Sequence, residues 1–475
     1  MNGGEILMKK LAHLQPQRVF SIFEQLCAIP HGSGDTGRIS DFCVAFARDL
    51  GLCCEQDTLG NVMIRKPASA GYEDHPPVIL QGHLDMVCEK APDCVIDFAA
   101  DGLDVDTDGE WVFAHGTTLG GDDGIAVAMA LAVLEAQDVC HPPLEVLLTV
   151  DEETGMYGAE GLKPGCLAGR RLINIDSEEE GVLTVSCAGG ARAEIDLPLT
   201  YIRADAAAYY VMVDGLQGGH SGVEIDKGRL NANVVMGEFL KTLDCRICSI
   251  HGGLKDNAIP VCCEAIIISE EDVVSAAAAF AVAHRVEGDP HLAITAEMAL
   301  ADAAMDADST RRVIDFLTTV PNGIQSMSED IPGLVQTSLN LGILTTEEDT
   351  LHASFAVRSS VNEEKIALLE RLAQVAAAFG GRYESYGHYP AWEYAKESHL
   401  RDVMCRVWEQ QTGATPAVVA IHAGLECGLL CEKLPGLDAV SIGPDMQDIH
   451  TCRERLSVLS TQRVYAYLLE VLKQL

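Results

Sequence analysis

Five side chains of types that bind metals follow apolar stretches of the sequence, at points where strands are expected to end. They are His83, Asp122, Glu153, Asp176 and His450. In α/β proteins, ligands collect at the carboxyl ends of the strands of one sheet. Two histidines and three carboxylates suit two adjacent ions of the zinc class, and a site without thiolate ligands leaves room for water. The sequence therefore predicts an α/β fold with a two-metal centre of the catalytic kind.

Apolar runs alternate with helical patterns in the first part of the chain. The runs are short and almost entirely apolar, as in strands of a sheet that helices cover on both faces. A buried helix is expected after Gly124, between two of these runs. The other expected elements are helices over 17–27 and 40–50 and strands over 78–80, 146–150 and 172–175.

The length of 475 residues exceeds what one hydrophobic core normally fills, which favours two domains. Near Gly190 the pattern changes to alternating strands and long alanine-rich helices, and the first pattern returns near Pro390. We therefore expect a catalytic domain made of residues 1–188 and 390–475, with a mostly parallel sheet covered by helices. Residues 189–389 are expected to form an inserted α+β domain that acts as a lid.

The charge balance argues against two classes of partner. Lys and Arg number 33 and Asp and Glu number 71, which gives a formal net charge of −38. Such a field repels nucleic acid and anionic membranes, so neither is expected as a partner. The longest apolar run, 125–134, is too short to span a bilayer. The seventeen cysteines are scattered and no signal peptide is visible, so we expect a reduced, cytoplasmic protein.

Neighbours of the metal-ligand candidates suggest a division of roles. Asp85 follows His83 by two residues and could fix the tautomer of its imidazole, as metal-bound histidines usually require. Of the adjacent Glu152 and Glu153, one could bind metal while the other takes a proton from water. Each motif also has a purely structural alternative: a hydrogen-bonded turn at His83, a helix N-cap formed by at least one of Asp122 and Asp123, or a solvated acidic loop at Glu152.

Taken together, the motifs resemble those of the metallopeptidase M20 family, and within it the cytosolic aminoacyl-histidine dipeptidase (peptidase D) branch. The resemblance extends from near residue 14 to the final helix, and the motifs follow in the order and spacing of the family. The motifs that carry it are QGHLDMV around His83, GTTLGGD ending at Asp122, DEETGM around Glu153, DSEEEG starting at Asp176 and GPDMQDIH ending at His450.

The resemblance implies a zinc-peptidase-like catalytic domain and a role for each candidate. The implied roles are a bridging ligand (Asp122), ligands of one ion (His83 and Asp176), ligands of the other ion (Glu153 and His450), a general base (Glu152) and the residue that orients His83 (Asp85). Two residues depart from the branch, because asparagine is expected at Asp123 and proline at Cys452. Both departures lie in ligand loops and therefore concern the geometry of those loops.

The resemblance also implies residues that meet the substrate. His220, in the motif GGHSG, would stabilise the tetrahedral oxyanion, and the residues expected to bind substrate are Asn257, Arg358, His422 and Glu426. Structural alternatives remain open for three of them: a local hydrogen bond for His220, a surface ion pair for Arg358 and a turn-shaping role for Asn257. A peptide carboxylate needs a cationic or multi-donor partner, which an acidic metal site does not supply.

The function implied is hydrolysis of dipeptides, including Xaa-His dipeptides, with two divalent metal ions. Zinc is expected first, and manganese or cobalt suits the same ligands. A metal-bridging water would attack the scissile carbonyl after losing a proton to Glu152. Two alternatives stay open: an acyl-amino-acid deacylase or carboxypeptidase with the same metal centre, and a catalytically silent metal-binding scaffold. The expected partner is a small peptide, and the sequence leaves a homodimer open.

Overall fold

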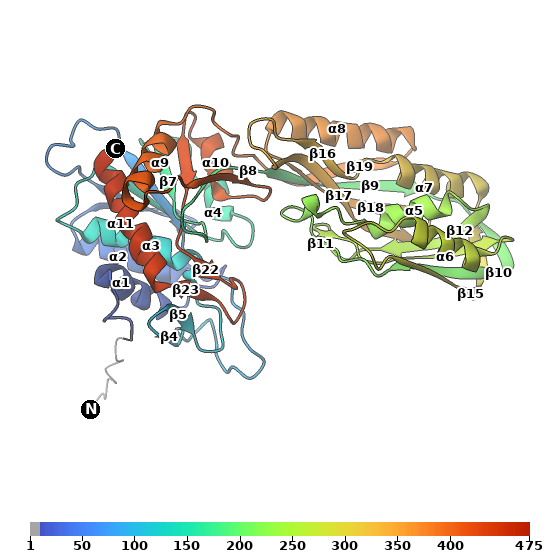
Figure 1. Cartoon of the computed structure of the whole chain (residues 1–475), viewed down its shortest axis with the longest axis horizontal. Helices are drawn as coiled ribbons and strands as arrows, with labels where there is room; N and C mark the ends of the chain where they lie inside the picture. Colours follow the sequence, from blue (N-terminus) through green and yellow to red (C-terminus); the bar gives the residue numbers. More distant parts are fainter. Residues whose placement is uncertain (1–9) are drawn as a thin grey trace. The chain divides into compact units, whose positions relative to one another are not determined.

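The structure is a computed structural model that describes residues 10–475, apart from the side chain at position 205. Contacts divide the chain into two compact units (Figure 1). The first unit runs through Val185 and continues with Tyr394–Val419 and Leu425–Leu475, and the second comprises Ser186–Glu393 and Ala420–Gly424. Within the described part of the chain, no helix combines the length and apolar character needed to cross a membrane.

An eight-stranded sheet forms the centre of the first unit. Its central strands pair in parallel and its outer pairs are antiparallel, so the sheet is mixed. The expected strands over 78–80, 146–150 and 172–175 lie at its centre as β3, β6 and β7. In spatial order the strands are β1 (Cys53–Gln56), β2 (Val62–Lys66), β6 (Leu144–Thr149), β3 (Val78–His83), β7 (Arg171–Asn174), β21 (Asp438–Ser441), β8 (Val182–Cys187) and β20 (Ala417–Ile421).

Helices pack around this sheet and share one hydrophobic core with it. The most deeply buried is α3 (Gly121–Glu135), whose side chains from Ile125 to Leu134 are all buried, because this segment is apolar on every side. A small four-stranded sheet completes the unit with β22 (Met446–Gln447), β23 (Arg455–Ser457), β5 (Trp111–Ala114) and β4 (Val105–Thr107). The other helices are α1 (Gln17–Cys27), α2 (Gly37–Asp49), α4 (Tyr157–Gly161), α9 (His399–Thr412), α10 (Glu426–Lys433) and α11 (Val458–Gln474).

The register of the parallel strands brings polar residues to one edge of the sheet. His83 is the last residue of β3 and pairs with Thr149, the last residue of β6. Strand β7 ends at Asn174, which pairs with Gln81 on one side and with Ser441 of β21 on the other. The segments that follow these strands therefore leave the sheet at the same end.

The second unit is built on a nine-stranded antiparallel sheet with helices alongside it (Figure 1). In β9 (Gly189–Pro198), buried residues alternate with more exposed ones, since helices cover one face of the strand. The sheet further contains β10 (Tyr201–Asp214), β12 (Cys245–Gly252), β14 (Cys263–Ser269), β15 (Ala293–Met305), β16 (Gly323–Met327), β17 (Val335–Glu347), β18 (Thr350–Ser359) and β19 (Arg382–Tyr389). Its helices are α5 (Ala232–Leu240), α6 (Val273–Ala283), α7 (Ala307–Thr319) and α8 (Asn362–Ala378), and a separate two-stranded sheet joins β11 (Gly219–His220) to β13 (Ala258–Ile259).

The predicted fold class is confirmed: an α/β unit with parallel central strands accompanies a separate antiparallel unit. The segment Ala420–Gly424 associates with the second unit, although it lies far beyond Pro390 in the sequence. The domain boundaries expected from the sequence, 1–188, 189–389 and 390–475, stay a prediction.

Candidate metal centre

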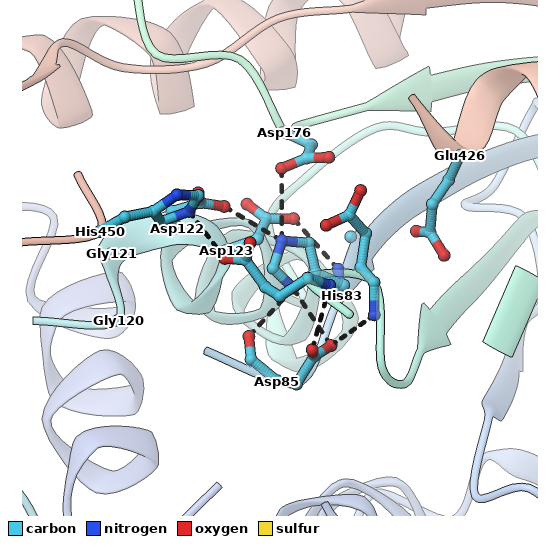
Figure 2. Close-up of polar contacts among 12 residues, drawn as sticks. His83, Asp85, Gly120, Gly121, Asp122, Asp123, Asp176, Glu426 and His450 are labelled. Atoms are coloured by element: carbon cyan, nitrogen blue, oxygen red, sulfur yellow. Dashed lines mark hydrogen bonds and ion pairs between the residues drawn. The ribbon is translucent and has the colours of Figure 1, made fainter. Parts of the chain in front are cut away.

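The five metal-ligand candidates meet in two clusters that share Asp122 (Figure 2). In one cluster, Nε2 of His83 lies 3.0 Å from Oδ1 of Asp122 and 3.5 Å from Oδ1 of Asp176. In the other, Nε2 of His450 lies 3.0 Å from Oδ2 of Asp122 and 2.9 Å from Oε1 of Glu153. The two oxygens of one carboxylate thus face two different groups of ligand atoms, as a bridging ligand requires.

Asp122 stands at the start of α3, before the helix becomes regular. Its backbone angles, φ −83° and ψ 103°, are not helical, and neither are those of Asp123. Gly120, the residue that caps the helix, has φ +66°, in the left-handed region that favours glycine. No side-chain cap is formed at this end of α3. The structural alternative of an N-cap at Asp122 is therefore wrong, and the side chain points to the two histidines instead.

Asp85 accepts three hydrogen bonds beside the metal-ligand candidates from a position that is 1% exposed. Its carboxylate accepts hydrogen bonds from Oγ of Ser33 at 2.8 Å, from N of Glu152 at 3.0 Å and from N of Glu153 at 3.3 Å. The Nδ1 atom of His83 lies 3.0 Å from the carbonyl oxygen of Asp85. When Nδ1 donates to this carbonyl, Nε2 presents its lone pair to the other ligands, which is the tautomer a metal needs.

The charge of the centre fits divalent cations. Burial would raise the pKa of Asp122, but hydrogen bonds from His450 and His83 outweigh it and hold that pKa below its usual range. Hydrogen bonds to Asp122 and Glu153 raise the pKa of His450 to about 10. Burial raises the pKa of Asp176 to about 6. Three carboxylates that share two imidazoles leave negative charge uncompensated, and two divalent ions would balance it.

Glu152 lies beside the ligands without belonging to either cluster. Burial raises the pKa of its carboxyl group well above the ordinary value, and the charges of Asp176, Glu426 and Glu153 add to this shift. A carboxylate with a raised pKa is a stronger base. Bound cations would lower the pKa again through their charge. The raised pKa therefore suits Glu152 to accept a proton.

Glu426 was expected to bind substrate, and it is fully buried at the first turn of α10. Its Oε2 accepts hydrogen bonds from Nε2 of Gln81 and from Oγ1 of Thr149, both at 2.6 Å. Its Oε1 has no hydrogen-bond partner among the described residues. Burial raises the pKa of Glu426 to about 7. These bonds tie Glu426 to the ends of β3 and β6, a link that the sequence analysis did not find, and Figure 2 shows it beside the cluster.

Asp123, which departs from the branch, is completely buried. Its Oδ2 accepts a hydrogen bond from N of His83 at 3.1 Å, while Oδ1 has no partner among the described residues. Burial, together with the charges of Asp176 and Asp122, raises its pKa well above the usual value. The side chain therefore supports the strand end that carries His83 and takes no place in either ligand cluster.

Glu454 is a residue that the sequence analysis missed. It is 3% exposed, and its carboxylate accepts hydrogen bonds from the backbone of the loop that leads to Asp122. Its only signal in the sequence is its place four residues after His450. A single acidic residue at such a spacing is not informative without knowledge of the fold.

Four predicted substrate residues belong to the second unit. Burial lowers the pKa of His220 and of His422. The positive charge of nearby Arg358 is the second largest cause of the shift for both imidazoles. Burial brings the pKa of His422 to about 4, and Nε2 of His422 lies 2.7 Å from Oγ of Ser338. Asn257 is exposed and lines a cavity of about 680 Å³ together with His220. The second unit thus gathers a guanidinium and two neutral imidazoles.

The chain matches the family described as Peptidase family M20/M25/M40 over residues 79–474. It is 38% identical to the cytosol non-specific dipeptidase of Escherichia coli (strain K12), over 98% of this chain and 99% of that protein. Its structure is similar to the crystal structure of aminoacylhistidine dipeptidase from Vibrio alginolyticus, with a TM-score of 0.93, 35% identity and coverage of 98% of both chains. Aminopeptidase PepT from Bacillus cereus shares the fold, with a TM-score of 0.57 and 15% identity over 97% of this chain and 99% of that one. The resemblance seen in the sequence is confirmed, and the chain belongs to the M20 peptidase family.

Proposed function

We propose that this protein hydrolyses dipeptides, including Xaa-His dipeptides, with two divalent metal ions, zinc first among them. The observation that carries the proposal is the pair of ligand clusters that share Asp122, with Glu152 beside them outside both ligand sets. The names of the full-length relatives, a cytosol non-specific dipeptidase and an aminoacylhistidine dipeptidase, support the choice of substrate. The former name also supports a cytoplasmic location.

The ligand residues and Glu152 divide the reaction between them. Two divalent ions, when bound, supply Lewis acidity for the scissile carbonyl and for the attacking water. Glu152 accepts a proton from that water as the water oxygen forms its bond to the carbonyl carbon. The same carboxyl group then returns the proton to the leaving amine as the C–N bond breaks. The backbone N–H of Glu152 donates to Oδ1 of Asp85 at 3.0 Å, and this hydrogen bond keeps Glu152 in place.

We further propose that His220 donates a hydrogen bond to the developing oxyanion. Its Nδ1 accepts hydrogen bonds from N of Gly222 at 3.2 Å and from N of Val223 at 3.3 Å. A neutral imidazole that accepts at Nδ1 carries its hydrogen on Nε2, which is then a donor. Burial and the charge of Arg358 lower the pKa of His220, which favours this neutral form.

Arg358 and His422 are proposed to recognise the C-terminal carboxylate of the substrate, and Asn257 to contact the substrate nearby. Nη1 of Arg358 donates to the hydroxyl of Tyr389 at 3.1 Å, which fixes the guanidinium. Its buried Nε has no partner among the described residues, so the group retains a donor for a ligand. A guanidinium with an unused donor suits a carboxylate.

Turnover of a substrate panel with the purified protein tests the proposal. Dipeptides, tripeptides, C-terminal dipeptide amides and N-acyl amino acids are offered to protein loaded with zinc, manganese or cobalt. We expect free dipeptides to be cleaved fastest, and Arg358→Ala to remove most of the penalty for amidation. Preferential cleavage of N-acyl amino acids would instead support the deacylase alternative. Binding of metal without any turnover would support the scaffold.

Glu152→Gln separates enzymatic turnover from a contaminating activity. This variant keeps the shape of the side chain and removes its basicity, so it should lose about 10²- to 10⁴-fold in kcat on every substrate of the panel. The matched control is Glu160→Gln, since Glu160 is exposed on α4 and lies outside both ligand clusters. Equal activity of Glu152→Gln and Glu160→Gln would refute the proposed base.

A further inference from the structure

We propose that Glu454 is a positioning residue that holds two metal-ligand loops together, those of Asp122 and His450. By holding these loops, its carboxylate would keep Asp122 and His450 beside Glu153, so that this ligand cluster exists before an ion binds. This inference rests on the proposed metal centre and deepens it. Glu454 belongs to neither ligand cluster, so its effect would pass through the two ligands it connects.

The carboxylate of Glu454 fills a ring of backbone donors. Oε2 accepts hydrogen bonds from N of Leu119 at 2.8 Å and from N of Gly120 at 3.2 Å. Oε1 accepts them from N of Gly121 at 2.7 Å and from N of Asp122 at 3.4 Å. Successive N–H groups that point at one spot form an anion-binding concavity. Here the chain supplies its own anion, and the last donor belongs to the bridging ligand.

The two glycines of this loop stand where a side chain would meet close neighbours. Gly120 has φ +66°, and a Cβ atom there would lie 2.9 Å from Sδ of Met86. A Cβ atom at Gly121 would lie 3.1 Å from Oε1 of Glu454 and 3.2 Å from Sδ of Met446. Both distances at Gly121 are tighter than ordinary contacts, so a side chain there would push the carboxylate away. The absence of a side chain at Gly121 therefore leaves room for the carboxylate of Glu454.

A compact turn connects Glu454 to His450. N of Glu454 donates to the carbonyl oxygen of Thr451 at 3.1 Å, and Oγ1 of Thr451 donates to the carbonyl oxygen of Asp448 at 2.7 Å. The same Oγ1 accepts a hydrogen bond from N of Arg453 at 3.1 Å. His450 has φ +58° within this turn. The backbone that orients His450 is thereby anchored to the loop of Asp122 through one carboxylate.

The two ligand clusters depend on Glu454 to different degrees. The side chain of His83 is 1% exposed and stands at the end of β3, where Asp85 and Asp123 support it. The side chain of His450 is 45% exposed and stands on a turn outside the strands. A ligand held only by a turn loses more orientation when the anchor of that turn is removed. We therefore expect the cluster with His450 to weaken first.

Metal titration of purified apo-protein tests this expectation. Glu454→Gln places an amide N–H₂ group against the four backbone N–H donors. Glu454→Ala removes the acceptor of all four donors, so the two variants disturb the loop in different ways. Wild-type protein should bind two equivalents of zinc. Both variants should keep one tight equivalent and bind the second about 10- to 100-fold more weakly, the range found when supports of metal ligands are removed. Competition with a chromophoric chelator measures both affinities without reference to turnover.

Glu145→Ala is the matched control. Glu145 is 5% exposed, and its Oε2 accepts hydrogen bonds from N of Ala168 at 2.9 Å and from N of Gly169 at 2.7 Å. It stands at the opposite end of β6 from Glu153, so its loss should lower the melting temperature and leave both zinc affinities unchanged. This control separates loss of stability from loss of metal.

Acetate provides a rescue that a purely structural role would not show. Acetate should enter the ring of donors in Glu454→Ala and tighten the second zinc site, with no such gain in wild type or in Glu145→Ala. Two unchanged zinc affinities in both Glu454 variants would overturn the inference alone. Equal weakening of both sites would also overturn it. Wild-type protein that bound no second equivalent would overturn the proposed metal centre as well.

Discussion

Replacing Asp85 with asparagine should damage both stability and metal binding, because one buried carboxylate serves three donors. Oδ1 accepts from N of Glu152, whereas Oδ2 accepts from N of Glu153 and from the hydroxyl of Ser33. Burial alone would raise the pKa of Asp85, but hydrogen bonds from His83, Glu152 and Ser33 lower it, so the group is ionised. An amide replaces one acceptor with a donor.

The orientation of the introduced amide that costs least free energy depends on which donor can change its role. A hydroxyl can rotate to accept a hydrogen bond, whereas a backbone N–H cannot. The amide nitrogen would therefore face Ser33, and N of Glu153 would lose its acceptor. A buried donor left without a partner costs about 1–3 kcal/mol. We expect Asp85→Asn to lower the free energy of unfolding of the apo-protein by about 1–3 kcal/mol, and to weaken zinc binding about 10- to 100-fold.

Calorimetry of the apo and zinc-loaded forms, with chelator competition, measures the two effects. Ser33→Ala is the control, since it removes one neutral donor and leaves the carboxylate to the two backbone N–H groups. It should cost about 0.5–1.5 kcal/mol and spare the zinc affinity. Asp85→Asn with unchanged zinc affinity would refute the account, even if the melting temperature fell, because Asp85 would then support the fold alone.

Three further changes probe other parts of the molecule. Glu152→Gln should lower kcat by about 10²- to 10⁴-fold and leave two zinc equivalents by metal analysis, whereas Glu153→Gln should lose zinc. Asp122→Ala should weaken both zinc sites, and retention of two tight equivalents would show that Asp122 does not bridge. Because burial brings the pKa of His422 to about 4 from 6.5, the unfolded chain binds a proton between these values that the folded chain does not. Stability should be full above about pH 6.5 and fall by up to about 3 kcal/mol as the pH drops toward 4, and His422→Gln should flatten this loss in urea unfolding of the apo-protein.

The sequence predicted those parts of the site that short-range patterns encode. Strand β3 begins with three apolar residues and ends at His83, and an apolar run from Val146 precedes Glu153, so the strand ends and their ligands were visible. Glu454 was not, because its donors lie more than 330 residues away and are backbone groups, which leave no mark on side-chain pattern. The burial of Glu426 likewise depends on bonds to strands far back in the chain. Contacts of this kind are set by topology, which local periodicity does not report.

The division of the first unit into separate stretches of sequence has a consequence for its biosynthesis. Asn174 in β7 pairs with Ser441 in β21. The pairing of β7 with β21 can therefore form only after roughly 270 further residues have been synthesised, which takes about 15–50 s at 5–20 residues per second. Until then β7 presents an unpaired edge with apolar side chains, which invites aggregation. The second unit, whose main segment is continuous, has all of its sheet strands synthesised before β21 emerges. His450 leaves the ribosome later still, so the proposed metal centre is completed only after β21 has emerged.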